Sequence, residues 1–388
     1  MDNLTHSLVG LAAAKAGLER TSPYATALCV VAANAPDADI VVRLAGPWEY
    51  LEHHRGITHS IIGTFAIALL LPVIFYIAEW AWARVRRRAP RARFRGLLIS
   101  SLILSASHPL LDWTNSYGVR PLLPWNAQWF YGDLVFILDP WLWLSVGGAA
   151  FLLTAKTRWR IAMWTALALL LTAAVWLLPQ RASIEYPLAS RVLWVAGLAG
   201  LATLHRFRIA TRWDASLAAV ALALVVAYWG VLAGVHRVTL RRAEIVAERL
   251  AQGRGENVVR VAATPTLADP LTWRCLAETD RGVHRFDISA SRGGGDNGDG
   301  SARNHVWFEK PRGEAAETVA RAAKDQRAEV FLGFARFPVA RVVRSCTEQI
   351  IIQFADLRYA EPGGAERGGF AVEIPLPDTP PPAARFVK

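Results

Sequence analysis

Residues 53–83 read HHRGITHSIIGTFAIALLLPVIFYIAEWAWA. Three histidines and an arginine stand here next to an apolar run, roughly residues 57–83, that is long enough to cross a bilayer. Ionisable groups at the mouth of a membrane helix are costly, so they persist mainly where they line a cavity, bind an ion or take part in chemistry. The stretch therefore predicts a membrane protein with a functional site at one end of a transmembrane helix.

Five further apolar runs predict membrane-spanning helices, at residues 96–111, 134–155, 161–178, 188–204 and 215–235. Two shorter apolar segments, residues 4–18 and 24–35, are separated by Thr21-Ser22-Pro23 and predict a helical hairpin packed against the longer helices. The hairpin either crosses the membrane or re-enters it from one side. Both alternatives bring its polar ends to the membrane surface that carries the histidines of residues 53–59.

The net charge of the chain is +11, of which +8 falls in residues 1–235, with 20 Lys and Arg against 12 Asp and Glu. Seven arginines lie within residues 84–95, and further basic loops occur at 156–160 and 205–208. Because positively charged loops stay in the cytoplasm, this pattern predicts a multi-pass protein of the bacterial inner membrane with these loops inside. No DNA- or RNA-binding motif accompanies the arginines, so nucleic acid is not expected as a partner.

Residues 236–388 contain no apolar run long enough to span a membrane. An amphipathic helix is expected at 238–251, and alternating apolar residues predict strands at 336–343 and 347–354. We therefore expect a mainly α protein with a multi-pass helical membrane domain (residues 1–235) and a soluble, extracytoplasmic α+β domain (residues 236–388). Outside the cytoplasm, Cys275 and Cys346 could form a disulfide. Three scattered histidines are expected on the surface of this domain: His236, His284 and His305.

Histidines and aspartates gather at the predicted outer membrane boundary. His108 and Asp112 are four residues apart, which places both on one helix face at a spacing that suits a single ion. Taken singly, each feature has a structural explanation: a simple His108–Asp112 pair, a helix cap or turn at Asp37 and Asp39, or a bond from His59 to a carbonyl. Taken together they predict a metal site. Neutral imidazoles and carboxylates without cysteine suit Zn²⁺, or else Mn²⁺ or Fe²⁺, better than Ca²⁺.

Four blocks carry a resemblance to a known family: residues 3–10 (NLTHSLVG), 36–39 (PDAD), 54–60 (HRGITHS) and 108–112 (HPLLD). They resemble the signature blocks of the YdjM-like family of membrane-bound predicted metal-dependent hydrolases, over roughly residues 1–150. The resemblance implies a multi-pass inner-membrane protein whose histidines and aspartates bind metal.

More distantly, the blocks are similar to the zinc-dependent phospholipase C and P1 nuclease group. That analogy implies five metal ligands: His6, Asp37, His59, His108 and Asp112. On the same analogy, Asp39 and His54 either bind metal themselves or support the residues that do. A three-metal centre like that of the group needs more histidines and a glutamate, so one or two ions are expected.

The metal site in turn implies a reaction. A bound metal lowers the pKa of water from ~15.7 towards ~7, and two metals also clamp the oxygens of a phosphate. Asp37 or Asp39 would bridge the ions or take the proton of the water, and Arg55 would bind phosphate through its planar guanidinium. The alternative for Arg55 is a salt bridge to Asp37, Asp39 or Glu52.

A site at headgroup depth meets lipids before it meets soluble molecules. We therefore expect a metal-dependent hydrolase that cleaves a phosphoester of a membrane lipid or lipid-linked substrate. The alternative is a non-catalytic membrane protein in which the metal is a structural clamp and the C-terminal domain binds a partner. Metal transport is less favoured, because the polar residues gather at one membrane face and form no path across. The sequence indicates no oligomeric state.

Overall fold

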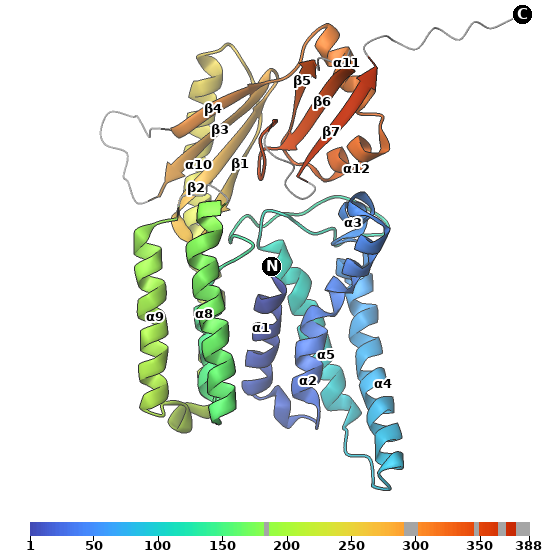
Figure 1. Ribbon diagram of the computed structural model, residues 1–388, viewed down its shortest axis with the longest axis vertical. Coiled ribbons are helices and arrows are strands. Elements are labelled where there is room, and N and C mark those ends of the chain that lie inside the picture. The colour runs from blue at the N-terminus through green and yellow to red at the C-terminus, as the bar shows by residue number, and fades with distance from the viewer. Residues whose placement is uncertain (182–185, 291–301, 345–348, 364–369, 378–388) are drawn as a thin grey trace, which may run out of the picture.

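The computed structural model describes residues 1–388 with the exception of 182–185, 291–301, 345–348, 364–369 and 378–388. Its N-terminal part is a helical bundle, and its C-terminal part contains two antiparallel sheets with helices (Figure 1). This confirms the predicted fold class of a mainly α membrane protein with an α+β C-terminal part. The bundle consists of α1 (Asn3–Lys15), α2 (Ala25–Asn34), α4 (Ile61–Val85), α5 (Phe94–Trp113), α6 (Pro140–Leu142), α7 (Gly148–Thr154), α8 (Arg158–Arg181), α9 (Leu188–Arg206) and the N-terminal part of α10 (Ala210–Gln252).

Among the described residues, six helical segments are long and apolar enough to cross a membrane. They are Ala25–Ala45, Ile61–Val85, Phe94–Trp113, Arg158–Leu177, Leu188–Arg206 and Ala210–Gln252. The first was predicted too short, because the 3₁₀ helix η2 (Ala35–Ala45) continues α2. The predicted span 134–155 is a shorter apolar helix, Pro140–Thr154, which contains the π-helix η4 (Trp143–Gly147). The Asp139 carboxylate caps this helix by accepting from the backbone N–H groups of Trp141 and Leu142.

The N-terminal hairpin runs through the bundle. The turn between α1 and α2, which includes η1 (Leu18–Arg20), lies at the end of the bundle opposite the sheets, beside the arginine-rich loop that joins α4 to α5 (Figure 1). Ser22 Oγ accepts a hydrogen bond from the backbone N of Arg93 there. A Cβ on Gly96 would lie 2.5 Å from the carbonyl oxygen of Thr21, so only glycine permits this approach. The hairpin thus extends from one end of the bundle to the other, an arrangement that favours the crossing alternative.

The histidine stretch forms a compact entry to α4. After the short helix α3 (Pro47–His53), the 3₁₀ helix η3 (Ile57–His59) turns directly into α4. Ser60 caps α4 by accepting from the N–H of Gly63, and a Cβ on Gly63 would lie 1.8 Å from the carbonyl of Ile57. This tight turn fixes His59 at the end of the bundle that carries the sheets.

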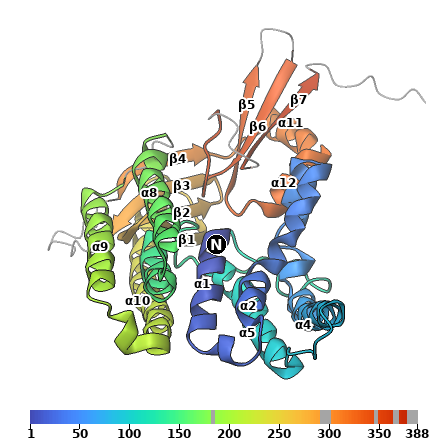
Figure 2. The same cartoon turned by 60° about the horizontal axis from the view of Figure 1, so that its bottom comes forward.

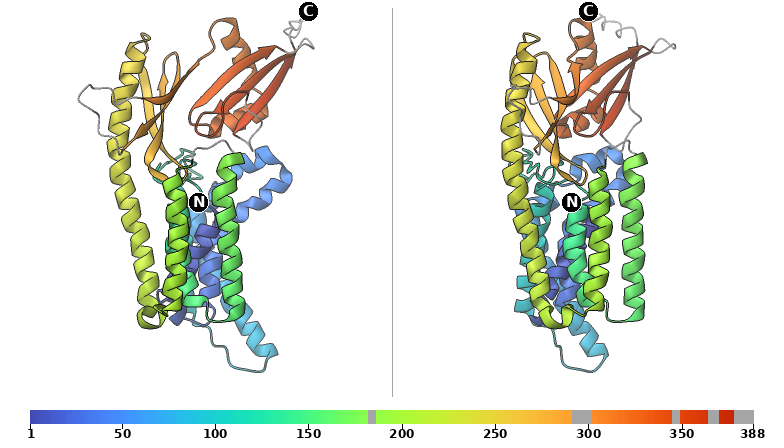
Figure 3. Two further views of the ribbon diagram at one scale, coloured as in Figure 1. Left: turned by 60° about the vertical axis from the view of Figure 1, so that its left-hand side comes forward. Right: turned by 90° about the vertical axis from the view of Figure 1, so that its left-hand side faces the viewer.

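The C-terminal part has two sheets. The first has the strand order β1 (Val258–Thr266), β2 (Asp269–Thr279), β3 (Gly282–Ser289) and β4 (Arg303–Glu309), all antiparallel. The second consists of β5 (Pro338–Arg344), β6 (Gln349–Asp356) and β7 (Ala371–Pro377), with α11 (Glu314–Ala322) and α12 (Gln326–Phe334) beside it. Helix α10 continues from the bundle along the first sheet (Figure 3). The predicted domain boundary at 235/236 therefore falls inside one continuous helix.

The second sheet unit rests on the bundle through α12, which packs against α3 (Figure 2). Side-chain contacts tie this sheet unit to the bundle. Arg336 pairs with Asp133 at 2.7 Å, Trp129 Nε1 donates to the carbonyl of Gly333 at 3.2 Å, and Arg358 donates to the carbonyl of Ser116 at 2.6 Å. The C-terminal part therefore covers the end of the bundle that holds the histidine stretch.

Candidate metal centre

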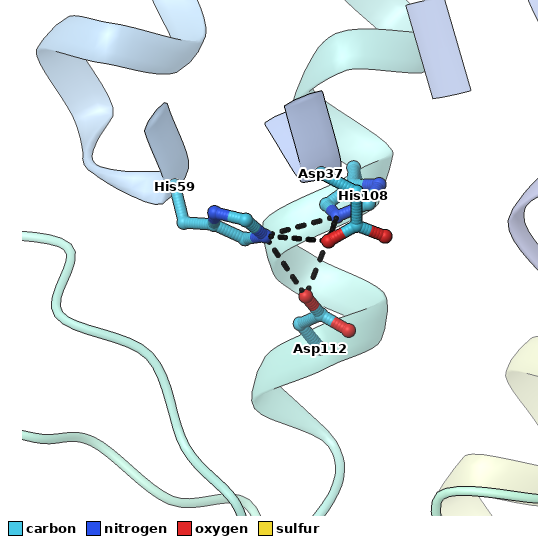
Figure 4. A group of neighbouring side chains, drawn as sticks. All are labelled: Asp37, His59, His108 and Asp112. Carbon is cyan, nitrogen blue, oxygen red and sulfur yellow. Dashed lines mark hydrogen bonds and ion pairs between the residues drawn. The ribbon is translucent and has the colours of Figure 1, made fainter. Parts of the chain in front are cut away.

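Four side chains from three separate segments converge at this end of the bundle (Figure 4). His59 Nε2 lies 3.1 Å from His108 Nε2, 3.3 Å from Asp37 Oδ1 and 3.2 Å from Asp112 Oδ2. His108 Nε2 lies 3.4 Å from each of the same two oxygens. We call Asp37, His59, His108 and Asp112 the metal tetrad. η2, η3 and α5 supply its members, and the predicted helical pair His108 and Asp112 lies on one face of α5.

The metal tetrad has the dimensions of a zinc site. A regular tetrahedron with edges of about 3.3 Å has its centre about 2.0 Å from each corner, which is the Zn–N and Zn–O distance. The four atoms all lie within 4.8 Å of one another, and three of the four residues are buried. The residues present therefore fit a four-coordinate divalent ion.

Hydrogen bonds on the far side of each imidazole support this interpretation. His108 Nδ1 lies 2.6 Å from the carbonyl oxygen of Ala33, which can only accept, so His108 carries its proton on Nδ1. His59 Nδ1 lies 3.0 Å from Thr58 Oγ1, whose own proton is donated to Asp39 Oδ2 at 3.2 Å. If both rings are neutral, as metal binding requires, the two Nε2 atoms 3.1 Å apart present lone pairs to the same point, which a cation between them would stabilise.

A second group of possible ligands shares Asp37 with the metal tetrad. It consists of Asp37, Asp39 and His54. His54 Nδ1 lies 3.1 Å from Asp39 Oδ1, and burial lowers the pKa of His54, so its imidazole is neutral at pH 7 and able to bind metal. Because Asp37 belongs to both groups, the residues present could hold one ion or two.

Asp112 is surrounded by cations and imidazoles on its other oxygen. Arg55 Nη2 lies 3.0 Å from Asp112 Oδ1, and His6 Nε2 lies 3.4 Å from the same atom. The nitrogen of Met1 also contacts this oxygen. His6 is fully buried and its ring stacks on His108 with the centroids 3.8 Å apart. His6 thus lies beside the metal tetrad and not within it, and neither of its ring nitrogens has a hydrogen-bond partner among the described residues.

Arg55 is held in place on all sides. Its Nη1 donates to the carbonyls of Asp112 and Gly118 and to Asn115 Oδ1, and its guanidinium lies over the ring of Tyr117 at 4.6 Å. It forms a salt bridge, as the alternative prediction stated, but with Asp112 and not with Asp37, Asp39 or Glu52. Its φ of +52°, uncommon for a residue with a side chain, directs its N–H at Asp39 Oδ2, 3.0 Å away.

Other residues of the predicted cluster point elsewhere. His53 is exposed and lies near Glu49 on α3, away from the metal tetrad. Three residues that support the site were not singled out from the sequence: Thr58, Asn115 and Tyr117. Thr58 lies inside a signature block, so its position between two histidines was a usable signal. Asn115 and Tyr117 follow α5 in a loop whose path the sequence does not indicate.

The C-terminal part contains a second histidine cluster, and here the surface prediction was wrong. His284 is fully buried, with Nε2 3.0 Å from Glu256 Oε2 and Nδ1 3.0 Å from His305 Nε2. The rings of His284 and His305 are 11° from parallel with centroids 5.2 Å apart, so they meet end to end as in a hydrogen bond. We call Glu256, His284 and His305 the relay. His305 is exposed as predicted, and His236 is half-buried with its Nε2 donating to the carbonyl of Ala263.

Among the described cysteines, Cys29 and Cys275 are buried and free. The predicted partner of Cys275, Cys346, lies outside the described residues. The disulfide therefore stays a prediction.

Among the described residues, six helices long and apolar enough to span a membrane and a buried set of imidazoles and carboxylates indicate a membrane protein with residues that could bind a metal ion. Residues 1–183 match the family described as YdjM inner membrane protein, which confirms the predicted family resemblance and extends it beyond residue 150. The match covers the metal tetrad and α8.

The chain is also 28% identical over 153 residues to an uncharacterized protein of Bacillus subtilis (strain 168), YfhP. The alignment covers 37% of this chain and 44% of that protein, so the chain spans less than half the length of this curated relative. No solved structure matches the chain. The more distant similarity to zinc-dependent phospholipase C and P1 nuclease stays a prediction.

Proposed function

We propose that this protein is a membrane-bound, metal-dependent hydrolase that cleaves a phosphoester of a lipid or lipid-linked substrate. The single observation that carries the proposal is the metal tetrad, in which two imidazole lone pairs and two carboxylate oxygens face one point. These residues would hold a divalent ion, Zn²⁺ first and Mn²⁺ or Fe²⁺ next, which would supply a Lewis acid for a phosphoryl oxygen and an acidified water.

The carboxylates have different tasks in this proposal. Asp39 accepts from His54, from the N–H of Arg55 and from Thr58, so both of its oxygens are occupied and it positions the ligands. Asp37 is the more exposed carboxylate and belongs to both ligand groups. We therefore assign to Asp37 the uptake of the proton when water attacks phosphorus. The ester P–O bond then breaks, and the proton passes to the leaving oxygen.

Arg55 acts through Asp112 in this scheme. Its guanidinium is 4% exposed and already bonded to one carboxylate and three neutral oxygens. Direct binding of a substrate phosphate, as first expected, would require it to leave these partners. We assign Arg55 to charge compensation and orientation of Asp112, which keeps Asp112 Oδ2 directed at the ion.

The basic loops support the proposed orientation in the membrane. Residues 84–95 lie at the bundle end opposite the sheets, and the positive-inside rule puts that end in the cytoplasm. The metal tetrad and residues 236–388 would then both lie on the extracytoplasmic side.

The test uses the full chain in phospholipid nanodiscs, loaded with Zn²⁺. We expect turnover of bis(p-nitrophenyl) phosphate or of a phospholipid, lost by more than about 10³-fold in Asp37→Asn and Asp112→Asn. His53→Ala, on an exposed residue outside the metal tetrad, is the matched control and should keep full turnover. Absence of bound metal after Zn²⁺ loading would overturn the proposal, as would turnover that survives both aspartate substitutions.

A second candidate function is a structural metal clamp with a partner-binding C-terminal part. Burial favours it, because His59, His108 and Asp112 are each at most 1% exposed and closed sites are typical of structural zinc. A thermal midpoint that rises with Zn²⁺ while neither phosphoester is cleaved would select this function.

A further inference from the structure

We infer that the substrate enters the metal site sideways from the bilayer, with its phosphate at Asp37 and His54 and its hydrocarbon chains remaining in lipid beside η2. The inference rests on the proposed function and narrows it to phosphoesters that carry a long hydrocarbon chain. Five residues form what we call the apolar lip: Ile40, Val41, Leu44, Ile57 and Ile61.

Exposure of the ligand side chains locates the opening. Asp37 is 12% exposed and His54 is 14% exposed, whereas the side chains of His6, His59 and His108 are fully buried. Both accessible residues belong to the η2–α3 region of the chain. A substrate therefore meets the site at this edge of the bundle.

The same 3₁₀ helix presents two different faces. Asp37 and Asp39 point to the histidines, while Ile40, Val41 and Leu44 are 55%, 61% and 90% exposed. η2 continues α2, and the two together form a segment long enough to span a membrane, so these side chains lie where that segment meets the membrane surface. Large aliphatic side chains at this depth are placed to contact acyl chains.

The start of α4 extends the apolar lip. Ile57 and Ile61, which flank His59 and Ser60, are 51% and 66% exposed. Exposed aliphatic side chains therefore stand on both η2 and the entry to α4, the two segments that flank Asp37 and His59. Arg43, on η2 itself, is exposed and lies over Tyr50 at 5.9 Å, and Tyr50 stacks on His54, so one cation stands near the opening to attract a phosphate.

The C-terminal part closes the route from the aqueous side. Tyr117 covers Arg55 and packs against Phe334 of α12 and against Trp129, with ring centroids 4.7 and 6.0 Å away. Tyr117 and Phe334 are 7% and 3% exposed. The aromatic side chains of Tyr117, Trp129 and Phe334 thus cover Arg55 on the side of the C-terminal part, whereas the side chains of the apolar lip are exposed.

The experiment compares two substrates in the same Zn²⁺-loaded protein. Val41→Gln combined with Leu44→Gln replaces the apolar lip next to the ligands, and Leu188→Gln is the matched control. Leu188 is 69% exposed and begins α9 at the same end of the bundle, away from the metal tetrad. We expect the double variant to lose about 10-fold or more in the turnover of long-chain phosphatidylglycerol vesicles. Turnover of bis(p-nitrophenyl) phosphate and bound Zn²⁺ should stay unchanged, and the control should behave as wild type.

The outcomes separate the inference from the proposed function. If wild type cleaves neither substrate, the proposed hydrolase fails. If it cleaves bis(p-nitrophenyl) phosphate but not the long-chain lipid, or if the double variant lowers both rates equally with Zn²⁺ content intact, sideways entry fails while the hydrolase stands. Photo-crosslinking adds a readout independent of activity. A phospholipid with a diazirine in its acyl chain should label residues 40–44 of wild type, and absence of label there would also overturn the inference.

Discussion

Two histidine pairs in this protein have nearly the same separation and opposite chemistry. The facing nitrogens are 3.1 Å apart in the metal tetrad and 3.0 Å apart in the relay. In the metal tetrad, acceptors outside the pair take the far N–H of each ring, so the neutral rings that a metal requires would turn two lone pairs toward each other. In the relay, Glu256 accepts the proton of His284 Nε2, which leaves His284 Nδ1 to accept a hydrogen bond from His305. The distance between the two rings therefore does not tell a possible ion site from a hydrogen bond. The hydrogen-bond partners of the other two ring nitrogens do.

The largest expected effect breaks the metal tetrad. His59→Ala should lower Zn²⁺ affinity by more than about 100-fold, because a direct ligand contributes more than the residues that support it. His284→Ala should leave Zn²⁺ affinity unchanged, since the relay already has a proton between its rings. Competition with a chromophoric chelator measures both. An equal loss of Zn²⁺ affinity in the two variants would contradict the assignment of the metal tetrad as the metal site and of the relay as a hydrogen-bonded group.

Next in size is the removal of a supporting group. Asp39→Asn keeps the shape of the side chain but weakens its bonds to His54 and Thr58, and we expect a 10- to 100-fold loss of Zn²⁺ affinity. The control is Glu244→Gln, because Glu244 is an exposed carboxylate of α10 that belongs to none of the groups of possible metal ligands. The same titration applies, and an unchanged affinity in Asp39→Asn would show that the hydrogen bonds behind the histidines do not tune the site.

The relay should matter for stability. Glu256 also accepts from Thr279 at 2.8 Å and from Arg254 at 3.1 Å, so removing His284 leaves a buried carboxylate with part of its bonding lost. We expect His284→Ala to cost about 1–3 kcal/mol. Thermal unfolding followed by near-ultraviolet circular dichroism should show a lower midpoint. His305→Ala, at the exposed end, should lower it less, and the reverse order would contradict the assignment.

The smallest effect is a pH dependence of the relay. Burial, with smaller contributions from His284 and Arg254, lowers the pKa of His305 below 6.5. Burial alone would raise the pKa of Glu256, but hydrogen bonds from Thr279, His284 and Arg254 outweigh it and lower the pKa below 4.5. In both cases the unfolded chain binds protons more readily than the folded one. The contribution of these two groups to the free energy of unfolding is therefore complete above about pH 6.5. It is lost as the pH falls through the pKa values that the two groups have in the folded protein.

Differential scanning between pH 8 and pH 4 tests this sign. The thermal midpoint of wild type should be level above pH 7 and fall below pH 6.5, and His305→Gln should remove the upper part of the fall. Taking the difference between the two proteins cancels other titrating groups. A wild-type midpoint that rises on acidification relative to His305→Gln would reverse the assignment.

The sequence predicted the metal tetrad better than its surroundings. Spacing alone predicted the pair His108 and Asp112, which are four apart on one helix, whereas Asp37 and His59 were expected from the family analogy, because their contacts with α5 join residues far apart in the chain. The position of His6 could not be predicted in this way. Whether its ring belongs to the metal tetrad or stacks beside it depends on how α1 packs against α5. The partner of Arg55 was missed for the same reason, since Asp112 is 57 residues away.

The fold class was predictable from hydropathy, whereas two of its details were not. The span 134–155 became a shorter helix because Asp139 caps it, and η2 lengthened α2 because a 3₁₀ turn can continue past Pro36. His284 was missed because strand alternation does not say which face α10 covers. An irregular register between β3 and β4 near Arg285 and Asp287 brings His305 next to His284. No residue in these strands predicts that shift.

The metal ligands are synthesised long before the C-terminal part that covers them, and this order has a consequence for biogenesis. The metal tetrad is complete at Asp112, but Phe334, which packs over Tyr117, is made 222 residues later. At about 5–20 residues per second, the ribosome leaves roughly 10–45 s in which the ligands have emerged and the cover has not. A cation can therefore be acquired during synthesis, from whichever compartment the nascent hairpin faces, before the finished protein closes around it.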